Sequence, residues 1–199
     1  MKYPKITGSE RRYFDSELGV ETRADGAKSR RVVGYALKFN TLSRDLGGFQ
    51  ERINPDALEG VDLSDVVALF NHDKNMILAR TSSKTLALSV DNVGLRYQFD
   101  APETSAGNDL LVSIQRGDVA GSSFAFCTNE DDWEMVGDIV IRSIKKFERI
   151  VDVSPVVFPA YAEADVAKRS LDHWKLENTP TPTPTPTPEA DAIMVEAYK

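Results

Sequence analysis

The chain has 199 residues, 41% of them hydrophobic and 28% charged, which is enough for one sizeable core in one domain with tails. Its 31 acidic and 24 basic residues give a formal charge of −7, which argues against a broad nucleic-acid-binding surface. A single cysteine excludes an internal disulfide, and no cluster of cysteines or histidines offers a metal site. No run approaches the roughly 20 apolar residues of a membrane span. We therefore expect a cytoplasmic protein with no cofactor, metal, nucleic acid or membrane as partner.

Three regions differ in composition. Residues 1–28 are polar and without sustained periodicity, so we expect an arm that is flexible or at best partly ordered. Residues 29–172 carry strand and helix patterns and form the expected domain. Residues 173–199 contain a Thr-Pro repeat at 179–188, which predicts an extended spacer of about 30 Å, followed by an acidic peptide.

The expected domain is rich in strands. Residues 31–40 read as a strand that enters a long loop, and residues 62–70, "DLSDVVALF", fit either a short helix or a buried strand. Residues 85–90 and 94–100 flank "DNVG" as a hairpin.

One helix and two or more strands follow that hairpin. Leu110, Leu111 and Ile114 lie at helical spacing, so residues 105–116 are expected to form a helix that ends at Gly117. Residues 122–128 and 138–159 supply at least two more strands, one of them long. The pattern predicts a strand-rich α+β domain with a barrel-like sheet and a few surrounding helices.

A histidine and two adjacent serines are candidates for nucleophilic chemistry. His72 follows an apolar run, where the chain leaves a core, and a neutral imidazole there can take a hydroxyl proton and return it to a leaving amine. Ser123 begins a strand in which Phe124 and Phe126 share one face and Ser123 lies on the other. Each feature taken singly has a simpler alternative. His72 could be a loop histidine with no catalytic role, and the serines could only permit tight packing.

A carboxylate that orients the imidazole would complete such a site. Glu148 and Asp152 lie on one predicted strand, and a separation of four residues places both on the same face of a regular strand. Glu148 also fits a solvated charge among basic residues, whereas Asp152 lies among apolar residues and needs a partner if it is buried. His173 lies next to the tail, and we expect it to be structural or inert.

Five segments in order resemble those of the prohead serine proteases of tailed bacteriophages, which share a fold with the herpesvirus assemblins. The resemblance covers roughly residues 20–170. The segments are residues 31–58 with the Gly-Gly-Phe-x-Glu loop, 69–73 "LFNHD", 91–104 "DNVGLRYQFDAPET", 116–126 "RGDVAGSSFAF" and 142–161 with the acid before Val-Ser and Pro-Ala-Tyr.

The resemblance implies an assemblin-like fold and three catalytic residues. In the family the nucleophile immediately precedes Phe-x-Phe, which selects Ser123 over Ser122, and Asn-His-Asp selects His72 as the base. The acid before Val-Ser implies Asp152 as the third member, with Glu148 as the alternative. Ser122 stands where methionine is usual and Ala125 where glycine is usual, and neither departure removes a catalytic group.

The function implied is a serine endopeptidase of prohead maturation, inside the assembling prohead in the host cytoplasm. Its expected partners are the phage scaffold and major capsid precursor proteins, which it would cleave along with itself. The expected trigger of its activity is formation of a homodimer or crowding within the shell. One alternative is a non-catalytic scaffold or capsid-assembly module of the same fold. Another, an esterase or amidase, is disfavoured because the chain lacks the Gly-x-Ser-x-Gly elbow.

Overall fold

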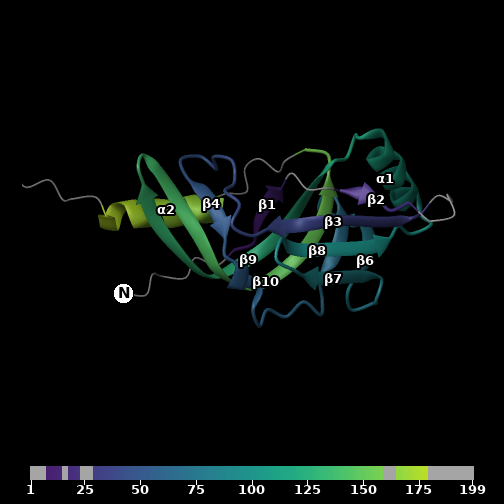
Figure 1. Ribbon diagram of the computed structural model, residues 1–199, viewed down its shortest axis with the longest axis horizontal. Helices are drawn as coiled ribbons and strands as arrows, with labels where there is room; N and C mark the ends of the chain where they lie inside the picture. Colours follow the sequence, from purple (N-terminus) through teal and green to yellow (C-terminus); the bar gives the residue numbers. More distant parts are fainter. Residues whose placement is uncertain (1–7, 15–17, 23–28, 159–164, 179–199) are drawn as a thin grey trace, which may run out of the picture.

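The computed structural model describes residues 8–14, 18–22, 29–158 and 165–178, and the structural statements below refer to these residues. Figure 1 shows the arrangement of the helices and strands. In chain order they are β1 (Glu10–Phe14), β2 (Gly19–Val20), β3 (Arg31–Lys38), β4 (Gln50–Ile53), a 3₁₀ helix (Pro55–Leu58), β5 (Val67–Phe70), β6 (Asp73–Arg80), β7 (Leu86–Val90), β8 (Gly94–Asp100), α1 (Ser105–Arg116), β9 (Gly121–Val136), β10 (Ile139–Val156) and α2 (Asp165–Asn178).

The described strands form two open sheets. One has the order β1-β9-β10-β5-β6, with β4 also paired to β10, and the other has the order β2-β3-β8-β7. The strand-rich α+β class is therefore confirmed, but the expected barrel-like closure is not supported. Closing a barrel requires the end strands of a sheet to pair, whereas β1 and β6 stand at opposite ends of the first sheet.

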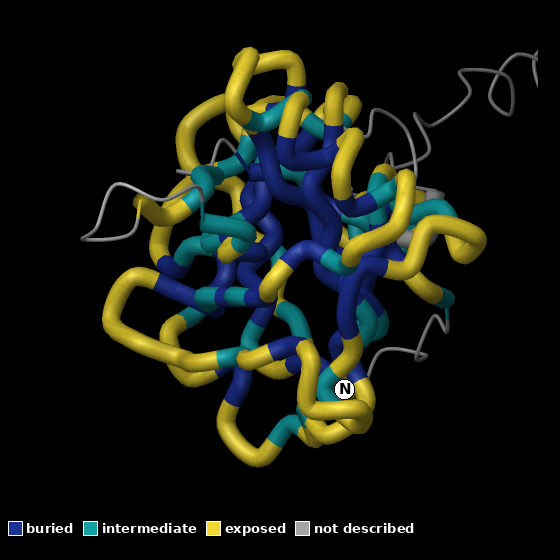
Figure 2. Tube along the Cα trace, turned by 90° about the vertical axis from the view of Figure 1, so that its right-hand side faces the viewer, coloured by how far each residue is buried: buried dark blue, intermediate teal, exposed yellow. Residues whose placement is uncertain are grey.

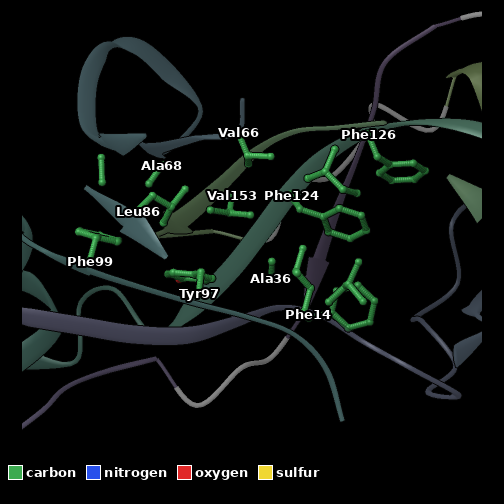
Figure 3. Packing of buried hydrophobic residues seen from close by; sticks show 14 of the residues in the cluster. Phe14, Ala36, Val66, Ala68, Leu86, Tyr97, Phe99, Phe124, Phe126 and Val153 are labelled. Atoms are coloured by element: carbon green, nitrogen blue, oxygen red, sulfur yellow. The ribbon is translucent and has the colours of Figure 1, made fainter. Parts of the chain in front are cut away.

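The main core lies between the two sheets, and the exposed segments lie around the outside (Figures 2 and 3). Phe124 and Phe126 of β9 stack with ring centroids 4.8 Å apart, and Phe147 of β10 meets Phe126 edge-on. The second sheet supplies Tyr97 and Phe99 from β8. Each aromatic residue comes from alternate positions of its strand, so the strand period of two directs these rings to one face.

Local sequence signals predicted several helices and strands correctly. The helix expected at 105–116 is α1, whose Thr104 side chain accepts a hydrogen bond from the Gly107 amide and whose end is capped by Gly117 at φ +80°. The hairpin around "DNVG" is β7 and β8. Residues 62–70 hold the strand β5, because Val67 and Ala68 pair in parallel with β10.

Two strands fall within the residues expected to be an arm. β1 pairs antiparallel with β9 along all five of its residues, and β2 pairs with β3. The inward-facing residues of β1 include the charged Glu10 and Arg12, so the sequence shows no apolar periodicity there. The strand β1 was not expected because two of its buried side chains are charged and form ion pairs, where a typical buried strand has apolar side chains.

A second, smaller apolar cluster lies away from the main core. Ala167 and Leu171 of α2 are buried against Phe49 and Val140. α2 runs across residue 172, where the domain was expected to end, and it includes His173. The Thr-Pro repeat and the acidic peptide lie outside the described residues. Neither α1 nor α2 is long and apolar enough to span a membrane.

Candidate active site

Three separate elements bring a hydroxyl, an imidazole and a carboxylate together. Nε2 of His72 lies 2.7 Å from Oγ of Ser123, which is in β9. Nδ1 of His72 lies 2.6 Å from Oδ1 of Asp152, which is in β10. All three side chains are buried or nearly so. The residues that the sequence analysis named first therefore form one continuous hydrogen-bonded series.

His72 is positioned by a two-residue turn between β5 and β6. Asn71 and His72 have φ of +53° and +58°, the signature of a type I′ hairpin turn, in which glycine is usual at the second position. The turn is held to the end of β10, because the Asn71 amide donates to the Pro155 carbonyl and its side-chain oxygen accepts from the Val157 amide. A histidine held in this backbone region stores strain, and such strain clusters at functional sites.

The register of β9 against β10 places Asp152 beside a further hydroxyl. Ser123 lies opposite Ser154, and Asp152 lies two residues before Ser154 on the same face. The fully buried Ser154 donates a hydrogen bond of 2.8 Å to Oδ1 of Asp152, and its Oγ lies 3.3 Å from Nδ1 of His72. Ser154 was not expected to have a role, although its spacing of two residues from Asp152 indicates a shared face on a strand.

Glu148 is not brought to His72. The pairing of β10 with β9 is irregular between Phe147 and Arg149 and again between Ile150 and Asp152. These irregularities break the alternation that a regular strand would keep over four residues. Glu148 is therefore exposed and Asp152 buried, and the structure brings only Asp152 to His72.

The two adjacent serines point in opposite directions. Ser122 Oγ lies 2.8 Å from the Tyr97 hydroxyl in the core between the sheets, while Ser123 faces His72. Burial raises the pKa of Tyr97 above its ordinary value, and the hydrogen bond with Ser122 offsets only part of this, so the phenol stays neutral. His173, in contrast, lies in α2 near Glu177 and away from this site.

The first strand covers the serine hydroxyl. Oγ of Ser123 lies within donating distance, 2.9 Å, of the backbone carbonyl of Arg12. Tyr13 stands opposite Ser123, and its ring occupies the space beside Gly121, where a Cβ would come within 2.1 Å of a ring carbon. Ser123 is fully buried, with this strand beside it in the sheet.

A buried group of charges, here called the charge cluster, holds β1 in place. Arg12 Nη2 donates to Glu51 Oε2 at 2.9 Å and to Glu10 Oε2 at 2.7 Å, and Arg12 Nε lies 2.9 Å from Glu51 Oε1 without making a hydrogen bond. Arg142 contacts Glu10, Glu51 and Asp131. Burial raises the pKa of Glu10, but the charges of Arg142 and Arg12 outweigh it and hold that pKa below its ordinary value. No sequence signal pointed to this cluster.

The described residues contain no group of three or more histidine, cysteine, aspartate or glutamate side chains that could hold a metal ion. A hydroxyl, an imidazole and a carboxylate in hydrogen-bonding order define the arrangement of the serine hydrolases.

Comparison with known proteins gives a narrower assignment. The model of the caudovirus prohead serine proteases matches residues 18–177, so the chain belongs to this family. The prohead protease of Enterobacteria phage HK97 is 28% identical over 156 residues, which are 77% of this chain and 65% of the length of that protein.

Two further similarities are weaker. A flagellar basal body rod protein, FlgB, of Aeromonas hydrophila is 27% identical over 118 residues, covering 58% of this chain and 83% of that protein. The structure of the bacteriophage T4 capsid assembly protease covers 77% of this chain and 99% of its own, with 11% identity and a TM-score of 0.49.

Proposed function

We propose that this protein is a serine endopeptidase that cuts scaffold or capsid-precursor segments, and its own chain, inside the assembling prohead. The observation that carries the proposal is the continuous hydrogen-bonded series from Ser123 through His72 to Asp152, in a chain of the prohead protease family. A buried aspartate in contact with an imidazole is the orienting group that such a nucleophile needs.

The geometry supports a definite division of roles. Asp152 accepts the Nδ1 proton of His72, which leaves Nε2 of a neutral ring free to accept the hydroxyl proton of Ser123. As that proton transfers, Oγ attacks the scissile carbonyl, and the imidazolium then gives the proton to the leaving amine. A water molecule, activated in the same way, releases the acyl group from Ser123.

A co-expression experiment tests the proposal. The chain is expressed with its head proteins as wild type, as Ser123→Ala and as Ser122→Ala, and the termini of every product are determined by mass spectrometry. We expect cleavage in the wild type and in Ser122→Ala, and uncleaved head proteins with Ser123→Ala. Cleavage that persists in Ser123→Ala would refute the protease role and favour a non-catalytic assembly module. Hydrolysis of small esters without any cut in the head proteins would favour an esterase.

A further inference from the structure

We propose that the edge of β9 now paired with β1 is the substrate-binding edge, and that it selects an extended segment carrying an acidic residue two positions before an arginine. Cleavage follows the arginine. This inference rests on the proposed function and adds the substrate class that the same site accepts. β1 supplies the geometry, since it is an extended segment of this kind already lying against the nucleophile.

The position of β1 identifies the carbonyl that faces the nucleophile. Arg12 contributes the carbonyl oxygen 2.9 Å from Oγ of Ser123, and the carbonyl carbon lies one bond of about 1.23 Å beyond that oxygen. A peptide in the same register therefore presents the carbonyl of its Arg12-equivalent residue to Ser123. Addition of an extended peptide to a sheet edge is a common mode of recognition, in which side-chain contacts at alternate positions give specificity.

The charges beneath β1 determine which side chains fit. Glu10 and Arg12 would depart together with β1. Three charged residues of the charge cluster would stay on the domain, namely Glu51, Asp131 and Arg142. The side chains of Glu51 and Arg142 are only 3% exposed. Glu51 and Arg142 still contact each other, but they lose the charge-assisted hydrogen bonds that Arg12 and Glu10 made with them. A segment that replaces β1 with an arginine and an acid at the same positions restores both hydrogen bonds.

The contacts distinguish arginine from lysine. Arg12 donates through Nη1 to the Arg11 carbonyl and through Nη2 to both Glu10 and Glu51, a planar fork of donors that a lysine ammonium cannot reproduce. At the other position, the Glu10 carboxylate accepts hydrogen bonds from Arg142 and from the Thr128 hydroxyl. The site thus fits glutamate at the first position and arginine at the third.

The residue after the cut is also recognised. Tyr13 follows Arg12, and its ring fills the space that Gly121 leaves beside the nucleophile. A large side chain fits there only because Gly121 has no Cβ. We therefore expect a large or aromatic residue after the scissile bond.

The reaction on such a segment is balanced by the groups already described. Ser123 Oγ bonds to the arginine carbonyl carbon, and its proton passes to Nε2 of His72. The bond from that carbon to the next nitrogen breaks, and the nitrogen takes the proton from His72. Water then adds to the ester, which releases the arginine carboxylate and restores the Ser123 hydroxyl.

The test is to locate every cut that depends on Ser123. The full chain is co-expressed with its head proteins as wild type and as Ser123→Ala, and the new termini are sequenced by mass spectrometry. We expect wild-type-specific cuts to follow arginine with an acidic residue two positions earlier, and the Arg12–Tyr13 bond of the chain itself to be among them. Wild-type cuts that follow other residues would overturn the inference while leaving the protease role intact. The absence of any Ser123-dependent cut would overturn the protease role itself.

Variants of neighbouring arginines sharpen the result. We expect Arg12→Ala and Glu51→Gln to slow the cut at the Arg12–Tyr13 bond at least tenfold, and the matched Arg11→Ala to leave the cut at that bond. Circular dichroism melting of each variant separates a specificity effect from loss of the fold. The termini of the cleavage products made by the wild type test the inference even if Arg12→Ala and Glu51→Gln both unfold. A cut that persists at the wild-type rate in folded Glu51→Gln would contradict the role of Glu51.

Discussion

Asp152 depends on more than His72 for its orientation. Its Oδ1 atom accepts from the Ser154 hydroxyl as well as lying 2.6 Å from the imidazole Nδ1. Two contacts on one oxygen fix the carboxylate more firmly than either alone, because a rotation that keeps one breaks the other. Ser154 thus acts on His72 through Asp152 and is a positioning residue.

Replacement of Ser154 by alanine should weaken catalysis without altering substrate binding. A hydrogen bond to a charged group is worth about 1.5–3 kcal/mol, so we expect kcat to fall roughly ten- to a hundredfold with KM unchanged. The measurement is the rate of Ser123-dependent cleavage as a function of substrate concentration. Ser154→Thr keeps a hydroxyl at this position and should recover most of the rate. A loss of stability with kcat unchanged would show that Ser154 only packs.

Ser122, the neighbour of the proposed nucleophile, should matter for stability and not for cleavage. Ser122→Ala removes the partner of the buried Tyr97 hydroxyl, which should lower the free energy of unfolding by about 1–3 kcal/mol. Adding Tyr97→Phe removes the Tyr97 hydroxyl that has lost its Ser122 partner, so the double variant should regain part of the lost free energy of unfolding. Urea unfolding of both variants and of the wild type tests this. Lost cleavage in a well-folded Ser122→Ala would contradict the opposite orientations of the two serines.

The role of β1 depends on charges that titrate in acid. Arg142 and Arg12 hold the pKa of Glu10 below its ordinary value of 4.5, so at mildly acidic pH the unfolded chain binds more protons at Glu10 than the folded chain does. The stability that Glu10 contributes is therefore present above pH 4.5 and is lost as the pH falls through the lowered pKa of the folded state.

The direction of this pH dependence predicts how the stability of one variant changes in acid. The free energy of unfolding of the wild type should fall below pH 4.5, and Glu10→Gln, although less stable at neutral pH, should lose less over the same range. The measurement is urea unfolding between pH 6 and pH 3, with the exposed Glu59→Gln as a control that should follow the wild type. Parallel curves for Glu10→Gln and the wild type would rule out a titrating Glu10 contact.

Elements defined by local signals were predictable from the sequence, and elements defined by distant partners were not. α1 carries its cap at Thr104 and its stop at Gly117 within its own sequence. β1 depends on Glu51 and Arg142, which are far along the chain, so its charged residues resemble those of a solvated arm. The shared face expected for Glu148 and Asp152 assumed a regular strand, and the irregularities of β10 arise only from its pairing with β9.

The candidate site was predictable to a similar extent. Motifs and family resemblance indicated His72, Ser123 and Asp152, because each lies in a short distinctive segment of the sequence. Ser154 and the charge cluster were missed, since their roles arise from cross-strand register and from burial. A pattern along one chain does not report which charges meet across a sheet.

The molecule as a whole divides its apolar side chains between two clusters. The larger one fills the space between the sheets and includes Leu110 of α1, and the smaller one joins Leu171 of α2 to Phe49 and Val140. Figure 1 shows α1 and α2 at opposite ends of the molecule. His72 and Ser123 are held by strands of the larger cluster, so the end that carries α2 should be able to loosen without disturbing them.

Matched leucine substitutions test this division. Leu110 and Leu171 are both buried, and truncating a buried leucine to alanine costs about 2–5 kcal/mol. For Leu110→Ala we expect the free energy of unfolding of the whole domain to fall by that amount. For Leu171→Ala we expect faster hydrogen exchange confined to α2 and to the parts of β9 and β10 around Trp133 and Val140, with exchange near Ser123 unchanged, because local opening draws only on local contacts. Exchange measured by mass spectrometry distinguishes the two patterns. If Leu171→Ala speeds exchange throughout β5 and the part of β9 that carries Ser123, the two ends are one cooperative unit and the division is wrong.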